Sequence, residues 1–274
     1  MIEIGFERVA FSYEGGYEAI KDISLCLSEN KRILIAGKNG SGKTTLLKHM
    51  NGLLKPREGA VFINGIDTRS ADVAELSEYV AIGFQEPSDQ IFCETVFEEV
   101  SYGPRNLQKV NCEELVNDAL MLTGLLALGN THPYDLHPSD RRWLAIGSVI
   151  AMDAPCLALD EPTAGMCYGE KLRLQKIIDR EWGKGKLIVI SSHDVSFFWP
   201  LCDRVILLQN GAVGFDGTPL ELLSNHNPAA LFRRAQIAFP IISRMARSLG
   251  FSRPVARSDD FLNELFAMGA SLKR

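Results

Sequence analysis

The segment Gly37-Lys38-Asn39-Gly40-Ser41-Gly42-Lys43-Thr44, continued by Thr45, fits the pattern G-x-x-x-x-G-K-[ST], and the rest of the chain is organised around it. Glycines at three of its positions let the backbone turn so that consecutive N–H groups point into one concavity. Such a nest attracts phosphate when it opens a helix, because the first N–H groups of a helix have no partner within it. The segment therefore predicts a site for the phosphates of a nucleotide.

The sequence on either side of this loop supplies the context that the motif requires. Residues 32–36 are almost entirely apolar and predict a buried strand, while residues 44–50 predict a helix. Within the loop, Lys43 brings a positive charge for the β- and γ-phosphates, and the hydroxyl of Thr44 suits Mg²⁺. A strand, a glycine-rich loop and a helix in this order favour nucleotide binding over a chance glycine-rich turn.

Composition narrows the class of protein. With 274 residues, 46% of them hydrophobic, the chain can form one large α/β domain or two smaller ones. A net charge of −5 and a pI near 5.6 disfavour nucleic acid as a principal partner. No apolar run approaches the roughly 18–20 residues of a membrane span, and no secretory signal is visible. We therefore expect a protein of the cytoplasm or of the cytoplasmic side of a membrane.

The cysteines form no C-x-x-C pair and mostly follow or precede apolar residues. This pattern favours buried, reduced thiols over a disulfide framework or a zinc site. The six positions are Cys26, Cys93, Cys112, Cys156, Cys167 and Cys202.

Strand-like segments precede the phosphate loop. Residues 2–11 and 23–27 flank a glycine turn at residues 14–16, which predicts an antiparallel layer. Tyr13 stands directly before this turn. It could be an ordinary hairpin residue, or its ring could stack on a nucleobase, and the surrounding residues leave both interpretations open.

Further apolar segments predict a sheet that a helical stretch interrupts. Strands are expected at residues 60–65, 79–84, 156–160 and 186–192, followed by a hairpin around Asn210-Gly211. Residues 94–151 have a helical pattern. The expected fold is therefore α/β, with an N-terminal antiparallel β layer and a helical insertion between two halves of the main sheet.

Polar side chains follow three of these strands. Gln85 ends the second, the pair Asp160-Glu161 closes the third, and His193 follows the fourth. The carboxyl ends of strands are where α/β folds place ligand contacts, and adjacent acids there are costly unless they have a role. We expect Asp160 to hold Mg²⁺ opposite Thr44 and Glu161 to polarise a water toward the γ-phosphate.

This order of features, from about residue 2 to residue 224, resembles an ATP-binding cassette ATPase. It implies a P-loop NTPase (RecA-like) core in residues 1–224, with a helical subdomain at about 94–151, and a small helical extension in residues 225–274. Four segments are similar to the ATPase subunits of energy-coupling factor importers of the cobalt and vitamin type: Phe11-Ser12-Tyr13, residues 47–56, Ser88-Asp89-Gln90-Ile91-Phe92 and Asp160-Glu161-Pro162-Thr163-Ala164-Gly165.

The resemblance implies ATP and Mg²⁺ as cofactors and gives each matching residue a role. Tyr13 would stack on adenine, and residues 37–45 would bind the phosphates. Gln85 would contact Mg²⁺ and the attacking water. Glu161 would be the general base, and His193 would contact the γ-phosphate.

The same resemblance implies partners in a membrane. Asp89 and Gln90 would lie near a groove that docks the coupling helices of an integral-membrane scaffold subunit. A separate membrane subunit would capture the substrate, a vitamin or a transition-metal ion, so no residue of this chain need contact it. The protein would be peripheral, on the cytoplasmic face of the cell membrane.

Two segments depart from the family pattern. In the family, Leu-Ser-Gly-Gly-Gln opens a helix and caps the γ-phosphate of the other subunit's ATP, whereas this chain has Leu136-His137-Pro138-Ser139-Asp140. Pro138 lacks an N–H donor of the anion-binding turn, and Asp140 brings negative charge toward a phosphate. In the second, Met166-Cys167 replaces the usual Leu-Asp.

The residues that act on this chain's own ATP are thus complete, while those that act on a partner's ATP are altered. We therefore expect a heterodimer with a second ATPase subunit, giving one competent and one degenerate site, and a homodimer is the alternative. Two other functions stay open, a regulatory nucleotide-binding cassette with little hydrolysis and a non-transport ABC protein acting on DNA or ribosomes.

The basic tail, residues 226–257, fits a solvated face, a dimer contact or a lipid-facing surface.

Overall fold

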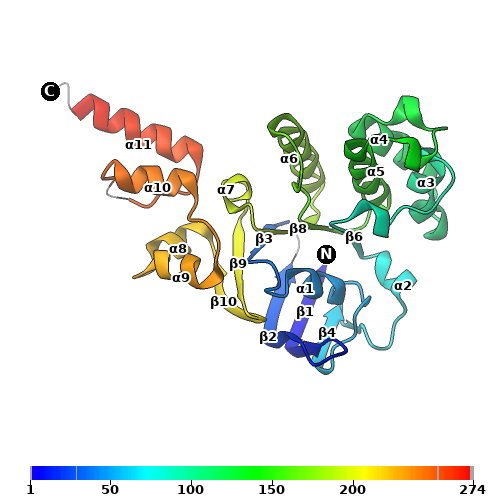
Figure 1. The fold of residues 1–274 in the computed structure, drawn as a ribbon, viewed down its shortest axis with the longest axis horizontal. Helices are drawn as coiled ribbons and strands as arrows, with labels where there is room; N and C mark the ends of the chain where they lie inside the picture. Colours follow the sequence, from blue (N-terminus) through cyan, green and yellow to red (C-terminus); the bar gives the residue numbers. More distant parts are fainter. Residues whose placement is uncertain (1, 29, 252, 272–274) are drawn as a thin grey trace.

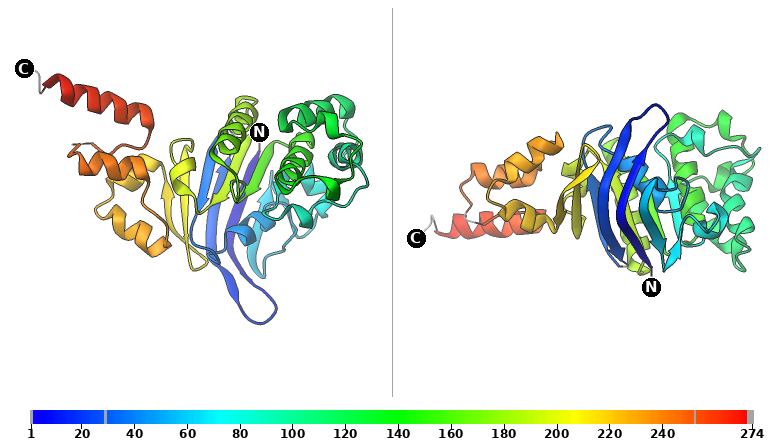
Figure 2. Two further views of the ribbon diagram at one scale, coloured as in Figure 1. Left: turned by 45° about the horizontal axis from the view of Figure 1, so that its top comes forward. Right: turned by 90° about the horizontal axis from the view of Figure 1, so that it is seen from below.

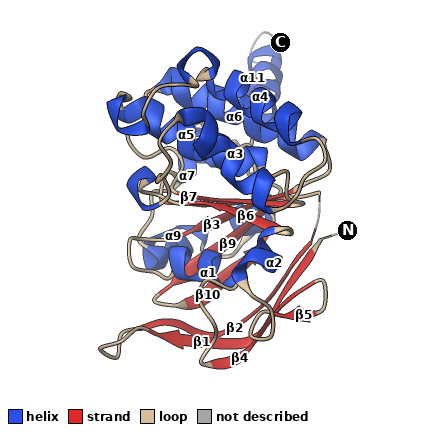
Figure 3. Ribbon diagram, turned by 90° about the vertical axis from the view of Figure 1, so that its right-hand side faces the viewer, coloured by secondary structure: helices blue, strands red, loops and turns tan. Residues whose placement is uncertain are grey.

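Two β-sheets form the centre of the protein. The computed structural model describes residues 2–28, 30–251 and 253–271. Figure 3 shows an antiparallel layer below, the main sheet above it and helices on top. The antiparallel sheet has the order β2-β1-β4-β5, formed by β1 (Glu3–Ser12), β2 (Glu18–Ser28), β4 (Glu58–Ile63) and β5 (Ile66–Asp67).

The main sheet has the order β10-β9-β3-β8-β7-β6, and all its strands except β10 run parallel. Its register pairs Ala36 with Ser192 and Asp160 with Ser191. The strand ends that carry polar residues therefore lie at one edge. The strands are β3 (Arg32–Ala36), β6 (Val80–Gly83), β7 (Cys156–Asp160), β8 (Leu187–Ser192), β9 (Arg204–Gln209) and β10 (Ala212–Gly217).

Successive residues of the inner strands face two different cores, because side chains alternate across a sheet. In β3, Ile33 and Ile35 face the antiparallel layer, and helix α1 (Lys43–His49) packs in this core. Leu34 belongs to the opposite core, under the upper helices. Buried on both faces, the strands read as continuous apolar runs.

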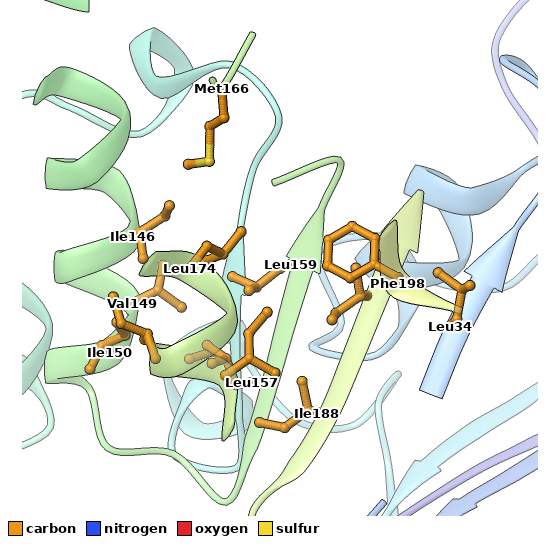
Figure 4. Packing of buried hydrophobic residues seen from close by; sticks show 14 of the residues in the cluster. Leu34, Ile146, Val149, Ile150, Leu157, Leu159, Met166, Leu174, Ile188 and Phe198 are labelled. Carbon is orange, nitrogen blue, oxygen red and sulfur yellow. The ribbon is translucent and has the colours of Figure 1, made fainter. Parts of the chain in front are cut away.

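The upper core is built by α6 (Tyr168–Gly183) and by the helical insertion, which consists of α3 (Val96–Asn106), α4 (Cys112–Thr123) and α5 (Pro138–Ala151). Figure 4 shows Leu157 and Leu159 of β7 to the right of Ile146 and Val149 of α5, with Leu174 of α6 between Ile146 and Leu159 in this view. Short elements connect these parts: α2 (Val73–Ser77), η1 (Pro87–Asp89), η2 (Leu126–Leu128), η3 (Pro133–Asp135) and α7 (Val195–Phe198).

The C-terminal helices divide into two groups. Helices α8 (Pro219–Ser224) and α9 (Pro228–Ala235) belong to the main core, where Phe232 packs 5.5 Å from Trp199 between ring centroids. Helices α10 (Ile241–Ser248) and α11 (Ser258–Ser271) form a small cluster of their own. Figures 1 and 2 show these two helices at the opposite end of the molecule from the helical insertion. The predicted α/β fold, with its β layer, insertion and helical extension, is confirmed.

All six cysteines are free thiols, but their predicted burial is only partly right. Cys156 and Cys202 are buried, whereas Cys26 and Cys167 are exposed. Cys26 is exposed because successive side chains of β2 alternate between its two faces and Cys26 lies on the outer one. Cys167 is the residue directly before α6. Burial raises the pKa of Cys202 to about 12.

Within the described residues, no helix combines the length and apolarity needed to cross a membrane.

Candidate functional site

The predicted phosphate loop joins β3 to α1 at the polar edge of the main sheet. Gly42 precedes the helix with φ of 103°, a conformation that favours glycine. A Cβ at this position would lie 2.5 Å from the carbonyl oxygen of Ala19, and one at Gly37 would lie 2.6 Å from the carbonyl oxygen of Leu208. The close approach of backbone to backbone thus requires glycine at both positions, and it shapes a cradle for a ligand.

The side chain of Lys43 is folded back into this cradle. Its Nζ donates to the carbonyl oxygens of Gly37 at 2.9 Å and Lys38 at 3.2 Å. It also lies 3.2 Å from Glu161 Oε1, and both side chains are only 6% exposed. A positive charge is therefore held inside the concavity and shielded from water, beside a carboxylate.

Asp160 and Thr44 meet as the sequence predicts, although 116 positions separate them. Thr44 Oγ1 donates to Asp160 Oδ2 at 2.6 Å. The hydroxyl of Ser191 donates to the other carboxylate oxygen of Asp160. Oxygen donors of this kind are those that Mg²⁺ prefers, and the residues present fit that ion.

Glu161 occupies a strained backbone conformation at the end of β7. Its φ is 46°, which is uncommon outside glycine. Its Oε2 lies 2.8 Å from His193 Nδ1 and accepts from Ser192 Oγ at 3.3 Å. Within the described chain, its buried Oε1 accepts no hydrogen bond and has only the ion-pair contact with Lys43. One carboxylate oxygen is therefore positioned by its neighbours, while the other is held only by the charge of Lys43.

A cleft of about 260 Å³ lies over the loop. Its walls come from the antiparallel layer, from the loop and α1, and from the ends of β6 and β7. The lining residues are Tyr13, Tyr17, Ala19, Asn39, Gly40, Gly42, Lys43, Thr44, Thr45, Gln85 and Glu161.

Most of the residues predicted for ATP and Mg²⁺ line this cleft, and Tyr13 is among them. Its hydroxyl lies 3.1 Å from Thr45 Oγ1. Asp160 is buried beneath Thr44, and the side chain of His193 is 58% exposed behind Glu161. Sequence reasoning missed Tyr17, an aromatic residue directly after the glycine turn that lines the same cleft as Tyr13.

The residues that replace the family's Leu-Ser-Gly-Gly-Gln signature, which we call the altered signature (residues 137–140), lie apart from the cleft. His137 caps α5, with its Nδ1 2.9 Å from Ser139 Oγ. Pro138 occupies the first helical position, where its missing N–H is tolerated. None of residues 137–140 lines the cleft of its own chain. The structure therefore does not bring the altered signature to the phosphate loop within one chain.

Gln90 lies at a second, larger cavity of about 680 Å³, between α2, α3, α5 and β6. Its side chain bridges two segments, donating to the carbonyl oxygen of Ala145 at 3.0 Å and accepting from the N–H of Phe84 at 3.4 Å. Asp89 ends η1, and its side chain lies outside the part that the structure describes.

Comparison with known proteins identifies the family of this chain. The family model described as ABC transporter matches residues 20–164. A protein of Pyrococcus furiosus, named only provisionally as an ABC transporter ATP-binding protein, is 38% identical over 96% of this chain and 98% of its own length. The energy-coupling factor transporter ATP-binding protein EcfA of Methanothermobacter thermautotrophicus is 34% identical over 88% of this chain and 77% of its own.

Among solved structures, cbiO1 from Clostridium perfringens, described as part of the ABC transporter complex cbiONQ, superimposes with a TM-score of 0.71. The two are 26% identical, and the match covers 90% of this chain and 98% of cbiO1. The chain therefore belongs to the ATP-binding proteins of ABC transporters, with energy-coupling factor ATPases among its relatives, and it is an ABC-type ATPase.

Proposed function

We propose that this protein is the peripheral ATPase subunit of an energy-coupling factor importer for a vitamin or a transition-metal ion. The observation that carries the proposal is the complete set of residues around one cleft, Lys43, Asp160, Glu161 and His193, in a chain whose relatives include the ATPases of such importers. Hydrolysis of ATP would supply the energy for transport.

Binding would use the loop first. The N–H groups of residues 37–45 would bind the phosphates, and Lys43 would exchange its contact with Glu161 for them. Tyr13 would stack on adenine. Thr44, Gln85 and Asp160 would hold Mg²⁺, which when bound supplies neutralisation of the phosphate charge.

Once Lys43 turns to the phosphates, Glu161 Oε1 is released from its ion pair. This buried oxygen would take a proton from the attacking water, while His193 holds Oε2 at 2.8 Å. His193 would also contact the γ-phosphate. The strained backbone of Glu161 fits a carboxylate held for chemistry rather than for folding.

The partner ATPase would be a different chain. The altered residues 137–140 lie apart from their own cleft, so they would face the ATP of a partner, where Pro138 and Asp140 weaken phosphate binding. An intact signature from that partner would in turn complete the site on this chain. A homodimer would instead place two altered signatures over two otherwise competent sites.

The larger cavity would dock the coupling helices of a membrane scaffold subunit, at the cytoplasmic face of the membrane. Its apolar side includes Phe92 and Tyr102, whose rings meet edge to face at 4.6 Å. Its other side carries three exposed acids, Glu75 of α2 and its two capping residues Asp72 and Glu78. An amphipathic helix with apolar and basic side chains suits this groove. A further membrane subunit would capture the substrate.

Turnover measurements test the proposal. The chain is purified alone and with the ATPase encoded beside it, and ATP hydrolysis is measured for both. We expect low turnover alone and high turnover in the pair. High turnover by the isolated chain would contradict the asymmetric dimer. ATP binding with negligible turnover in both would instead favour the regulatory cassette.

A further inference from the structure

Tyr17 has no part in the roles proposed above, yet it reaches the phosphate loop. It follows a turn in which Gly15 and Gly16 have φ of 96° and 84°. The side chain is 57% exposed, so burial does not explain its position. Its hydroxyl nevertheless donates to the carbonyl oxygen of Gly40 at 2.6 Å. An exposed side chain is thus fixed to the loop by one short hydrogen bond.

Gly40 is a turning point of the nest. Its φ of 76° is a left-handed conformation, which reverses the chain so that successive N–H groups can point into one concavity. A Cβ at Gly40 would meet only one atom of the described chain within 4 Å, the hydroxyl oxygen of Tyr17 at 3.6 Å. This part of the loop is otherwise open, so Tyr17 is what packs against it.

The remainder of the loop is anchored by the backbone of other elements. Lys38 donates its N–H to the carbonyl oxygen of Ala235 at 3.1 Å, and the carbonyl oxygen of Ser41 accepts from the N–H of Gly211 at 3.1 Å. Between these two anchors, the loop receives one hydrogen bond from a residue outside it in the part of the chain that the structure describes. This is the bond from the hydroxyl of Tyr17. Without it, the segment around Gly40 would lose its external support.

We propose that Tyr17 is a positioning residue for the phosphates. Its hydroxyl holds Gly40 so that the nest is already formed before a phosphate arrives, and it does so separately from the recognition of adenine by Tyr13. Preformed donors lose less freedom on binding than flexible ones. The inference rests on phosphate binding by this loop, and it is independent of the transport function and of the partner.

The test compares Tyr17→Phe, which removes only the hydroxyl, with Tyr17→Ala, which also removes the ring. Tyr168→Phe is the matched control, because Tyr168 is another exposed tyrosine, at the start of α6, and it lines neither of the two cavities described above. Binding of Mg²⁺-ATP and of Mg²⁺-tripolyphosphate to the full chain is measured by calorimetry. Thermal unfolding of each variant is followed in parallel, so that an effect on folding is distinguished from one on binding.

We expect Tyr17→Phe to weaken both ligands by the same factor, about fivefold, as for the loss of one hydrogen bond, with the melting temperature unchanged. Wild-type affinity of Tyr17→Phe for both ligands would overturn the proposal. A loss for ATP alone in Tyr17→Ala would also overturn it, because Tyr17 would then contact the nucleoside. If the wild-type chain bound neither ligand, the assigned phosphate site itself would fail, which is a different result.

Discussion

Replacing Glu161 with Gln tests the proposed general base most directly. The substitution keeps the size of the side chain, and the amide can retain the contacts with Ser192 at 3.3 Å and His193 at 2.8 Å. It removes the charge and the basic oxygen that faces Lys43. The chemistry should therefore be lost while the shape of the site is kept.

The magnitude follows from the role. A general base contributes about 10²–10⁴-fold to a rate, or about 3–5 kcal/mol of activation free energy. We expect hydrolysis by the ATPase pair to fall by at least about 100-fold. ATP affinity should rise, because Lys43 no longer has to leave a carboxylate 3.2 Å away and the γ-phosphate no longer approaches a like charge.

The assay is single-turnover phosphate release, with ATP binding measured on the same preparation. Glu113→Gln serves as the matched control, since Glu113 is an exposed acid in the first turn of α4. If Glu161→Gln binds ATP and still hydrolyses it within about threefold of the wild-type rate, another group takes the proton and the assignment is refuted.

Three further predictions address the metal site, the dimer and the core. Titration with ATP in the presence and absence of Mg²⁺ gives the factor by which Mg²⁺ increases ATP affinity. Asp160→Asn should reduce this factor by at least about tenfold, and an unchanged factor would exclude a role of Asp160 in metal binding. Restoring Ser-Gly-Gly-Gln at residues 137–140 should raise turnover of the isolated chain by at least about tenfold, whereas unchanged turnover contradicts the asymmetric dimer. Phe232→Ala should lower the free energy of unfolding by about 3–5 kcal/mol in urea, because the ring is 2% exposed, and a loss below about 1 kcal/mol would show that α9 adds little to the core.

The pH dependence of stability gives a fifth prediction. Burial raises the pKa of Cys202 to about 12, whereas a thiol of the unfolded chain ionises near pH 8.5. The neutral thiol thus favours the folded state fully below about pH 8.5, and this contribution is lost as the pH rises toward the folded value. Urea unfolding between pH 8 and 10 should show a smaller loss of stability for Cys202→Ala than for the wild type, and equal losses would contradict the assignment.

The phosphate loop and its flanking elements could be predicted from the sequence because their causes are local. Glycine spacing, an apolar pentapeptide and a helical segment specify β3, the loop and α1 without reference to distant residues. The predicted proximity of Thr44 and Asp160 also holds. It could be inferred because the carboxyl ends of parallel strands share one edge of a sheet.

Other features depended on packing that no local pattern encodes. The position of α9 in the main core and the exposure of Cys167 are of this kind, because Cys167 lies in a loop without a periodic pattern. The exposure of Cys26, in contrast, follows from a local pattern, since it alternates along β2 with the buried residues Leu25 and Leu27.

The chemical class of this protein and the main elements of its fold could be read from the sequence, which also predicted a set of residues for the ATP site. The tertiary structure alone showed that Lys43 is paired with Glu161, that His193 holds the other oxygen of that carboxylate, and that Tyr17 reaches Gly40. The physical reason is distance along the chain. Strand register and side-chain packing bring these groups together across many intervening residues, and both are set by the whole fold rather than by any segment of it.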